Sequence, residues 1–143
     1  MISAKAWRQI QQAFKWQCAY CRMPAVYLPQ GLQKEHIVPR SLEGPDAVRN
    51  ICPACPNCNS HKTNKILGTD PESGEEVPLF NPRRQKWTEH FEWDKAGTKI
   101  IGRTKVGRAT VTVLKMNLPD IVAWRSIIVG IGGYPPKLDH GLG

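Results

Sequence analysis

The chain has 143 residues, of which 41% are hydrophobic and 22% are charged, as in an ordinary soluble globular protein. No apolar run approaches the ~20 residues of a membrane-spanning helix, and the N-terminus lacks a secretory pattern, so we expect no membrane association and a reducing, cytoplasmic location. The formal net charge of +8 favours a polyanionic partner.

The positive charge is concentrated in the first half of the chain. Residues 1–68 contain nine Lys and Arg against three Asp and Glu, whereas residues 69–143 contain eleven against nine. A polyanion would therefore be expected to bind mainly the first half. Charge alone does not require this, because many basic proteins have no specific polyanionic partner.

A helix is predicted near the N-terminus. Ser3 is a suitable N-cap, because its hydroxyl can accept a hydrogen bond from an unpaired backbone N–H of the first turn. Trp7, Ile10 and Phe14 then recur at helical spacing. We therefore expect an amphipathic helix over residues 4–16, with its apolar stripe in the core.

Proline and glycine divide the next segment into short pieces. The apolar runs at residues 25–28 and 35–39 predict two short strands joined by a turn. Residues 42–53 show little regular pattern beyond a possible short turn at 47–49. A segment of this kind is typical of a loop that carries a site.

A boundary is predicted after the first 68 residues. A short helix is expected over residues 57–67, with Gly68 as the residue that stops it. Residues 69–82 are polar and rich in turn-forming residues, which is typical of a linker. We therefore expect a module over residues 1–68 and a C-terminal extension over residues 69–143.

The extension is predicted to contain a hairpin and two helices. Phe91 with Trp93, and Ile100 with Ile101, flank a turn and predict a β-hairpin. Together with the first half, these elements indicate the α+β class.

The two helices of the extension are recognised from their starts. Thr104 is a suitable cap for a helix over residues 105–116. Asn117 and Pro119 favour the start of another helix, which would reach about residue 129. The residues from Gly130 onward are rich in glycine and proline and predict a mobile tail.

The segment before the hairpin combines cations with aromatic side chains. Such mixtures are found on nucleic-acid-binding surfaces, and Arg83, Arg84 and Lys86 are candidates for that role. Trp87 and Phe91, however, lie four residues apart and are predicted to pack together in the core.

Four cysteines in two pairs indicate a metal site. The pairs are Cys18-x-x-Cys21 and Cys55-x-x-Cys58, and each can supply two ligands of a tetrahedral Zn²⁺ from one tight turn. An all-sulfur ligand set leaves no open position, so this zinc would be structural and not catalytic. Cys52, among apolar neighbours, is predicted to be a buried small hydrophobe.

Three polar residues beside the cysteines suggest chemistry at a different metal. Glu35 offers a carboxylate oxygen and Asn59 a carbonyl oxygen, which are ligands suited to Mg²⁺ or Mn²⁺. His36 could act as a base, because an imidazole is largely neutral at pH 7 and can take a proton from water. Each residue taken singly could equally be an ordinary strand end or helix cap.

This combination resembles the HNH endonucleases over about residues 18–68. The resemblance rests on Glu35-His36-Ile37-Val38-Pro39-Arg40, on Asn50, and on Cys55-Pro56-Asn57-Cys58-Asn59-Ser60-His61-Lys62. It implies a ββα-metal finger, similar to a treble clef, held by a four-cysteine zinc knot. The segment from Pro78 to Phe91 also resembles the C-terminal extension of bacterial and phage HNH proteins.

The resemblance also implies a role for each polar residue. His36 would activate water, Glu35 and Asn59 would bind one divalent ion, and Asn50 would orient the active-site loop. The implied reaction is hydrolysis of DNA to 5′-phosphate and 3′-hydroxyl ends. Glutamate in place of the commoner aspartate, and Asn59 in place of a final histidine, leave the choice between Mg²⁺ and Mn²⁺ open.

Basic residues near the motif are candidates for DNA contact. Arg40, Lys62 and Lys65 could bind phosphates, and His61 could face phosphate or solvent. The main alternative to an endonuclease is a non-catalytic zinc-knot module that binds nucleic acid. A zinc-stabilised adaptor for another protein is a third hypothesis and predicts no affinity for DNA.

Overall fold

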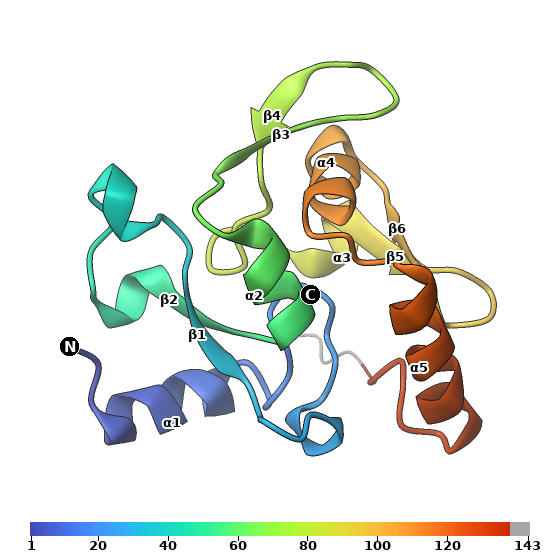
Figure 1. Ribbon diagram of the computed structural model, residues 1–143, viewed down its shortest axis with the longest axis horizontal. Helices are drawn as coiled ribbons and strands as arrows, with labels where there is room; N and C mark the ends of the chain where they lie inside the picture. The colour runs from blue at the N-terminus through green and yellow to red at the C-terminus, as the bar shows by residue number, and fades with distance from the viewer. Residues whose placement is uncertain (138–143) are drawn as a thin grey trace.

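Three antiparallel sheets of two strands each, with short helices between them, form residues 1–137, the part of the chain described by a computed structural model (Figure 1). The mixture confirms the predicted α+β class. None of the described helices is both long and apolar enough to cross a membrane.

The N-terminal helix α1 (Ala4–Ala13) begins where it was predicted. The Ser3 hydroxyl accepts a hydrogen bond from the Ala6 N–H at 3.1 Å. The helix ends three residues before the predicted residue 16, because Lys15 and Trp16 adopt positive φ angles of 58° and 56°. Such angles are incompatible with a continuing right-handed helix.

The elements around the motif follow in ββα order. Strand β1 (Gln33–His36) pairs antiparallel with β2 (Ile51–Ala54), with His36 opposite Ile51, and helix α2 (Pro56–Lys62) follows. The prediction of a strand at residues 25–28 was wrong. That run forms the 3₁₀ turn η1 (Ala25–Tyr27), because the partner of β1 comes from residues after the loop and not from those before it.

The loop between β1 and β2 contains two further 3₁₀ turns. They are η2 (Arg40–Leu42) and η3 (Val48–Asn50), and the second lies where a short turn was predicted at 47–49. Helix α2 is shorter than the predicted 57–67. It ends at Lys62, because Thr63 adopts a φ of 50°, and Gly68 lies in a strand instead of stopping the helix.

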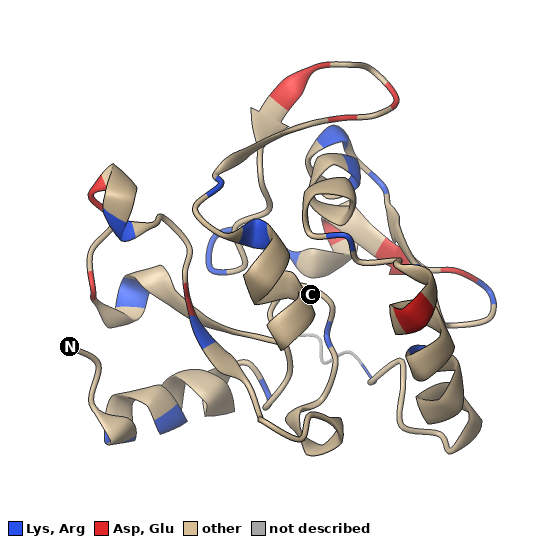
Figure 2. Cartoon of the chain, in the orientation of Figure 1, with Lys and Arg blue, Asp and Glu red and all other residues tan. Residues whose placement is uncertain are grey.

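The segment predicted as a linker is a hairpin. Strand β3 (Leu67–Thr69) pairs with β4 (Glu76–Pro78), and the turn between them and β4 carry acidic residues (Figure 2). A side chain at Gly68 would collide with Val113 of α4 (Lys105–Val113), so glycine lets the hairpin lie directly against that helix.

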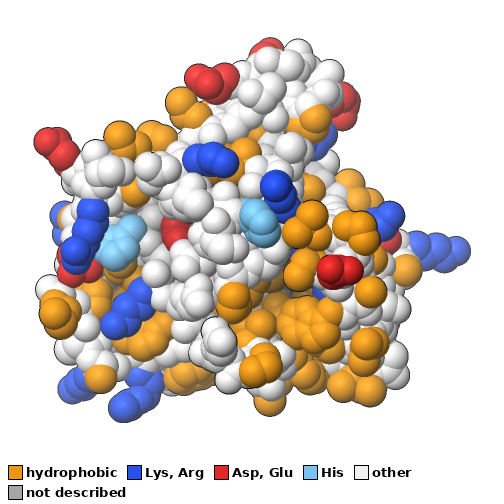
Figure 3. Space-filling model, viewed as in Figure 1, with side chains coloured by type: hydrophobic (Ala, Val, Ile, Leu, Met, Phe, Trp, Pro, Cys, Tyr) orange, Lys and Arg blue, Asp and Glu red, His pale blue; other side chains and the backbone are white. Residues whose placement is uncertain are grey.

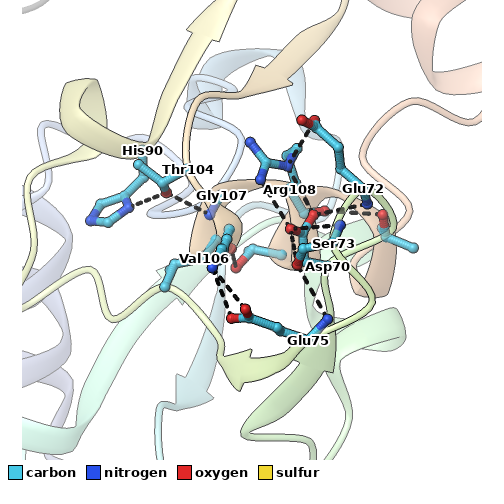
Figure 4. A network of polar contacts seen from close by, with 12 residues as sticks. Asp70, Glu72, Ser73, Glu75, His90, Thr104, Val106, Gly107 and Arg108 are labelled. Carbon is cyan, nitrogen blue, oxygen red and sulfur yellow. Dashed lines mark hydrogen bonds and ion pairs between the residues drawn. The ribbon is translucent and has the colours of Figure 1, made fainter.

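A buried carboxylate joins this hairpin to α4. The Asp70 carboxylate accepts a hydrogen bond from Arg108 Nε at 2.8 Å and another from Arg108 Nη2 at 2.9 Å. It accepts a third from the Ser73 hydroxyl at 2.6 Å (Figure 4). Hydrogen bonding to Arg108 is the main reason why the pKa of Asp70 lies below its ordinary value. The carboxylate is therefore charged and fully paired.

The rest of the extension follows the prediction closely. Helix α3 (Trp87–His90) leads into β5 (Phe91–Trp93), which pairs with β6 (Ile100–Gly102), and α5 (Pro119–Gly130) follows α4. Thr104 caps α4 by accepting the Gly107 N–H at 3.0 Å, as predicted. Helix α4 ends at Val113, short of the predicted 116, and Lys115 adopts a φ of 49°.

A core of aromatic side chains connects the two halves of the chain. Trp87 and Phe91 pack with their ring centroids 5.2 Å apart, which confirms the predicted core pair. The Trp87 indole donates to the Tyr20 carbonyl at 2.7 Å, and the Tyr134 hydroxyl donates to the Cys21 carbonyl at 2.7 Å. Both bonds link the extension to the turn that carries the first cysteine pair.

The prediction of a mobile tail from Gly130 onward is wrong for its first part. Tyr134 is only 3% exposed, and its ring packs edge-on against Trp93. The chain is therefore held to the core for several residues beyond α5. The remainder of the predicted tail, residues 138–143, lies outside the described residues.

We expect Asp70→Asn to lower the midpoint of thermal unfolding, because Arg108 loses its charged partner. A carboxyl whose folded-state pKa is depressed stabilises the fold above its unfolded pKa of about 3.9, and this contribution falls as the pH drops further. Thermal unfolding followed by circular dichroism should therefore show a difference between wild type and variant near pH 7 that shrinks below about pH 4.

The control is Glu92→Gln, which removes the half-exposed partner of Arg103 and should change the midpoint little. A difference between wild type and Asp70→Asn that is independent of pH would show that the ion pair is not its cause.

Candidate metal cluster and active site

The two cysteine pairs meet in one buried cluster. The sulfur atoms of Cys18, Cys21, Cys55 and Cys58 all lie within 4.8 Å of one another, and those of Cys21 and Cys55 are 3.6 Å apart. A tetrahedral ion with bonds of ~2.3 Å to sulfur needs ligand atoms at about this separation. The four side chains therefore fit a single Zn²⁺.

Local backbone geometry prepares each pair for a cation. The N–H of Cys21 donates to the Cys18 sulfur, and the N–H of Cys58 donates to the Cys55 sulfur, both at 3.4 Å. Burial opposes ionisation of Cys18, but hydrogen bonds from the other three cysteines outweigh it and lower the pKa of this thiol. A bound cation would favour thiolates at all four positions.

Cys52 lies close by without joining the cluster. It is fully buried in β2, and burial raises the pKa of its thiol well above the ordinary value. The prediction that it is a buried small hydrophobe is confirmed. It also provides a matched control for the cluster, because it is a buried cysteine in the same core.

His36 has a partner that the sequence analysis missed. Its Nε2 atom lies 3.1 Å from Oδ1 of Asp46, and the hydrogen bond to His36 is the main reason why the pKa of Asp46 lies below its ordinary value. An ionised carboxylate can only accept a hydrogen bond, so Nε2 carries the proton. In the neutral imidazole, the free lone pair is then on Nδ1.

Glu35 lies in a buried ion pair with Lys62. The carboxylate is 4% exposed, and its Oε1 atom accepts a hydrogen bond from the Lys62 ammonium at 2.7 Å. Burial raises the pKa of Glu35, and the hydrogen bond from Lys62 opposes this increase. The second carboxylate oxygen has no contact with Lys62.

Lys62 is not exposed as its predicted role in phosphate contact requires. It is 1% exposed, and besides Glu35 its ammonium donates to the carbonyl oxygens of His36 at 3.2 Å and Ile37 at 3.0 Å. All of its donors are used inside the protein. A phosphate contact by Lys62 is therefore incompatible with this placement, and Lys62 instead fixes the end of β1 to α2.

Asn50 holds the loop that follows His36. Its side-chain oxygen accepts the Val38 N–H at 2.9 Å, and its side-chain nitrogen donates to the carbonyl oxygens of Val38 and Pro45, each at 2.9 Å. Asn50 is buried and uses its side chain entirely for the backbone. The geometry is that of a residue that orients a loop.

Asn59 lies beside Glu35 and His36. It follows Cys58 on α2, and all three side chains line one surface pocket. The Asn59 amide nitrogen donates to the Gln33 side chain at 2.7 Å, which leaves its carbonyl oxygen for another partner. The structure thus brings together the three residues that the sequence analysis selected for chemistry.

The remaining candidates for DNA contact have different surroundings. Arg40 lines the same pocket and pairs with Asp46 at 2.9 Å, and Lys65 is exposed. His61 donates from Nδ1 to the Asn57 carbonyl at 2.8 Å. On the face shown in Figure 3, basic and histidine side chains lie around a small acidic patch, whereas several acidic side chains gather towards the hairpin β3–β4.

The roles of Asp46 and Lys62 were not predicted from the sequence, for different reasons. Asp46 lies in a loop, where its side-chain direction could not be predicted. Lys62 gave a signal, because it lies four residues after Cys58 on α2 and therefore shares the buried face of that helix. That spacing could have indicated burial.

The comparisons with known proteins agree with this geometry. Residues 18–65 match the family model described as HNH endonuclease. No curated protein and no solved structure matches the chain.

We expect Cys58→Ser to lose the bound zinc and most of the folded structure, because metal binding by such clusters supplies on the order of 10 kcal/mol of folding free energy. Zinc content can be measured by atomic emission and folding by circular dichroism. Cys52→Ala, the matched control, should retain one zinc per chain. Equal zinc content in wild type and Cys58→Ser would contradict the proposed ligand set.

Proposed function

We propose that this protein, whose residues 18–65 form an HNH endonuclease domain, is a metal-dependent endonuclease that hydrolyses phosphodiester bonds in DNA. The observation that carries the proposal is the pocket in which Glu35, His36 and Asn59 lie together beside the cysteine cluster. Phosphodiester hydrolysis needs an activated water, stabilisation of charge on the phosphoryl oxygens and assistance to the leaving oxygen. A base and one divalent ion can supply all three.

His36 is the proposed general base. Because Asp46 holds the proton on Nε2, Nδ1 is the atom that takes a proton from the attacking water. Asp46 also stabilises the imidazolium that forms in this step. It therefore acts as a positioning residue, and Arg40 in turn holds its other oxygen at 2.9 Å.

Glu35 and Asn59 are the proposed ligands of Mg²⁺ or Mn²⁺. Lys62 binds one oxygen of Glu35, so the other oxygen remains for a cation, and the carbonyl oxygen of Asn59 is free in the same pocket. Bound there, the ion would stabilise charge on the phosphoryl and leaving oxygens. Asn50 keeps the loop after His36 in place through its hydrogen bonds to Val38 and Pro45.

The proposed cofactors and products follow from these assignments. Zn²⁺ in the cysteine cluster is structural, since the ligand set leaves no open position. The products are 5′-phosphate and 3′-hydroxyl ends. Arg40, Lys65 and His61 are the proposed contacts with DNA phosphates beside the pocket.

One observation favours the alternative of a non-catalytic DNA-binding module. Glu35 is buried and already paired with Lys62, as in a purely structural ion pair. A structural pair, however, gives no role to the Asp46–His36 contact or to the free oxygen of Asn59. Both hypotheses predict DNA binding, so cleavage is what separates them.

We expect the zinc-loaded protein to nick supercoiled plasmid when Mg²⁺ or Mn²⁺ is added, and His36→Ala to lose this activity, because the variant lacks the imidazole that takes the proton from water. Nicking can be measured on agarose gels, together with zinc content and circular dichroism, which should not change. Equal nicking by wild type and His36→Ala would exclude His36 as the base.

We expect Asp46→Asn to reduce kcat by at least about tenfold with KM little changed, because an amide can donate as well as accept and no longer fixes the tautomer of the imidazole. The ¹⁵N chemical shifts of labelled His36 report the tautomer directly. They should show protonated Nε2 in the wild type and a mixture of tautomers in Asp46→Asn. Asp46→Glu should restore part of kcat and part of the population with protonated Nε2. An unchanged tautomer with reduced kcat would contradict the positioning role.

A further inference from the structure

A groove of about 500 Å³ borders the loop that Asn50 holds. One wall comes from the loop after β1 and includes Val38 and Asn50. The other wall comes from the segment after β4 and includes Asn81 and Arg84. The groove therefore lies between the HNH domain and the C-terminal extension.

The lining of the groove carries positive charge without compensation. Arg49, Arg83 and Arg84 line it, and no aspartate or glutamate does. Arg49 and Arg84 are exposed and make no side-chain hydrogen bond or ion pair within residues 1–137. Three arginines from two segments of the chain thus line one cavity, which favours an anionic ligand.

The arginines of the extension are held in place by their backbone. The Asn81 side-chain oxygen accepts the Arg83 N–H at 3.0 Å, and the Gln85 side-chain oxygen accepts the Asn81 N–H at 2.8 Å. Buried Phe80 and Trp87 anchor the two ends of this turn. The arginines are therefore presented on a fixed turn and not on a free loop.

Arg83 is ordered further by its own side chain. Its Nε atom donates to the Ile51 carbonyl at 2.9 Å, and its guanidinium lies 5.6 Å from the centre of the Phe14 ring. These contacts use Nε and one face of the guanidinium and leave the terminal nitrogen atoms available. A planar guanidinium held in this way can donate two hydrogen bonds to a phosphate.

We propose that the groove of Arg49, Arg83 and Arg84 binds the phosphate backbone of DNA flanking the cleavage site. This inference rests on the proposed function, because it takes the ligand in the pocket of His36 to be DNA. His36 and Pro39 line the pocket, and the two residues between them, Ile37 and Val38, line the groove, so the same short segment of the chain borders both. The role of the extension is then to lengthen the DNA contact.

The test compares Arg49→Ala/Arg84→Ala with Lys95→Ala/Lys99→Ala, both in full-length zinc-loaded protein carrying His36→Ala to prevent cleavage. The control pair has the same charge change and lies on the exposed β5–β6 turn, away from the groove. Arg83 is left intact, because it also packs against the core. Fluorescence anisotropy with a labelled duplex measures affinity over a series of salt concentrations.

We expect the groove variant to bind about tenfold more weakly near 0.1 M salt, and its salt dependence to lose the contribution of about two phosphate contacts. The control pair should change both quantities much less. Equal effects of the two double variants, or an unchanged salt dependence in the groove variant, would overturn the proposal, and so would wild-type protein without measurable affinity for DNA.

A cleavage assay separates this proposal from the proposed function. If wild-type protein does not cut DNA but its binding depends on Arg49 and Arg84, the nuclease assignment fails and the groove is confirmed as a DNA site. For cleavage, the two double variants are made again with His36 intact; if wild-type protein cuts DNA and the groove variant binds and cuts as well as the control pair, the groove proposal fails alone.

Discussion

The meeting of two distant turns at one set of four sulfur atoms is the constraint on which the rest of the structure depends. Cys21 and Cys55 are 34 positions apart in the chain, and their sulfur atoms are 3.6 Å apart in space. This closure places β2 beside the first turn, where the Ala19 N–H donates to the Pro53 carbonyl at 2.8 Å. The register of β1 on β2 puts Gln33 opposite Ala54, next to the start of α2, and Glu35 then meets Lys62 at the end of that helix.

Within this frame, one buried ammonium organises the end of β1. Lys62 reaches from α2 to a carboxylate and two backbone carbonyls, all from three consecutive residues. A buried charge is tolerated only when its partners are complete, and here they are. The same helix carries Cys58 and Asn59, so the structural cluster, the ion pair and the pocket share one short rigid element.

The sequence was most informative where residue type alone determines the outcome. The cysteine spacing, the caps Ser3 and Thr104 and the β5–β6 hairpin could all be predicted, because they depend on local chemistry. Helix ends were predicted less well. Positive φ angles at Lys15 and Thr63 ended two helices early, and neither residue is a typical signal for such a conformation.

Features that depend on tertiary contacts could not be predicted from local pattern. The acidic stretch after Gly68 was expected to be a linker, since its polar composition does not show that Asp70 is buried against Arg108 on a helix 38 positions away. Likewise, the glycine-rich end after α5 gave no indication that Tyr134 packs in the core. In the candidate site, the three residues of the pocket were predicted, but the partners Asp46 and Lys62 were not.

The hydrogen bond from Tyr134 to the Cys21 carbonyl has a consequence for the order in which the protein matures during synthesis. All four cysteines leave the ribosome well before Trp87 and Tyr134, which cover the first turn in the finished structure. The four sulfur atoms are therefore synthesised before the side chains that cover the first turn. In the finished structure, the C-terminal extension closes the side of the cluster that carries Cys18 and Cys21.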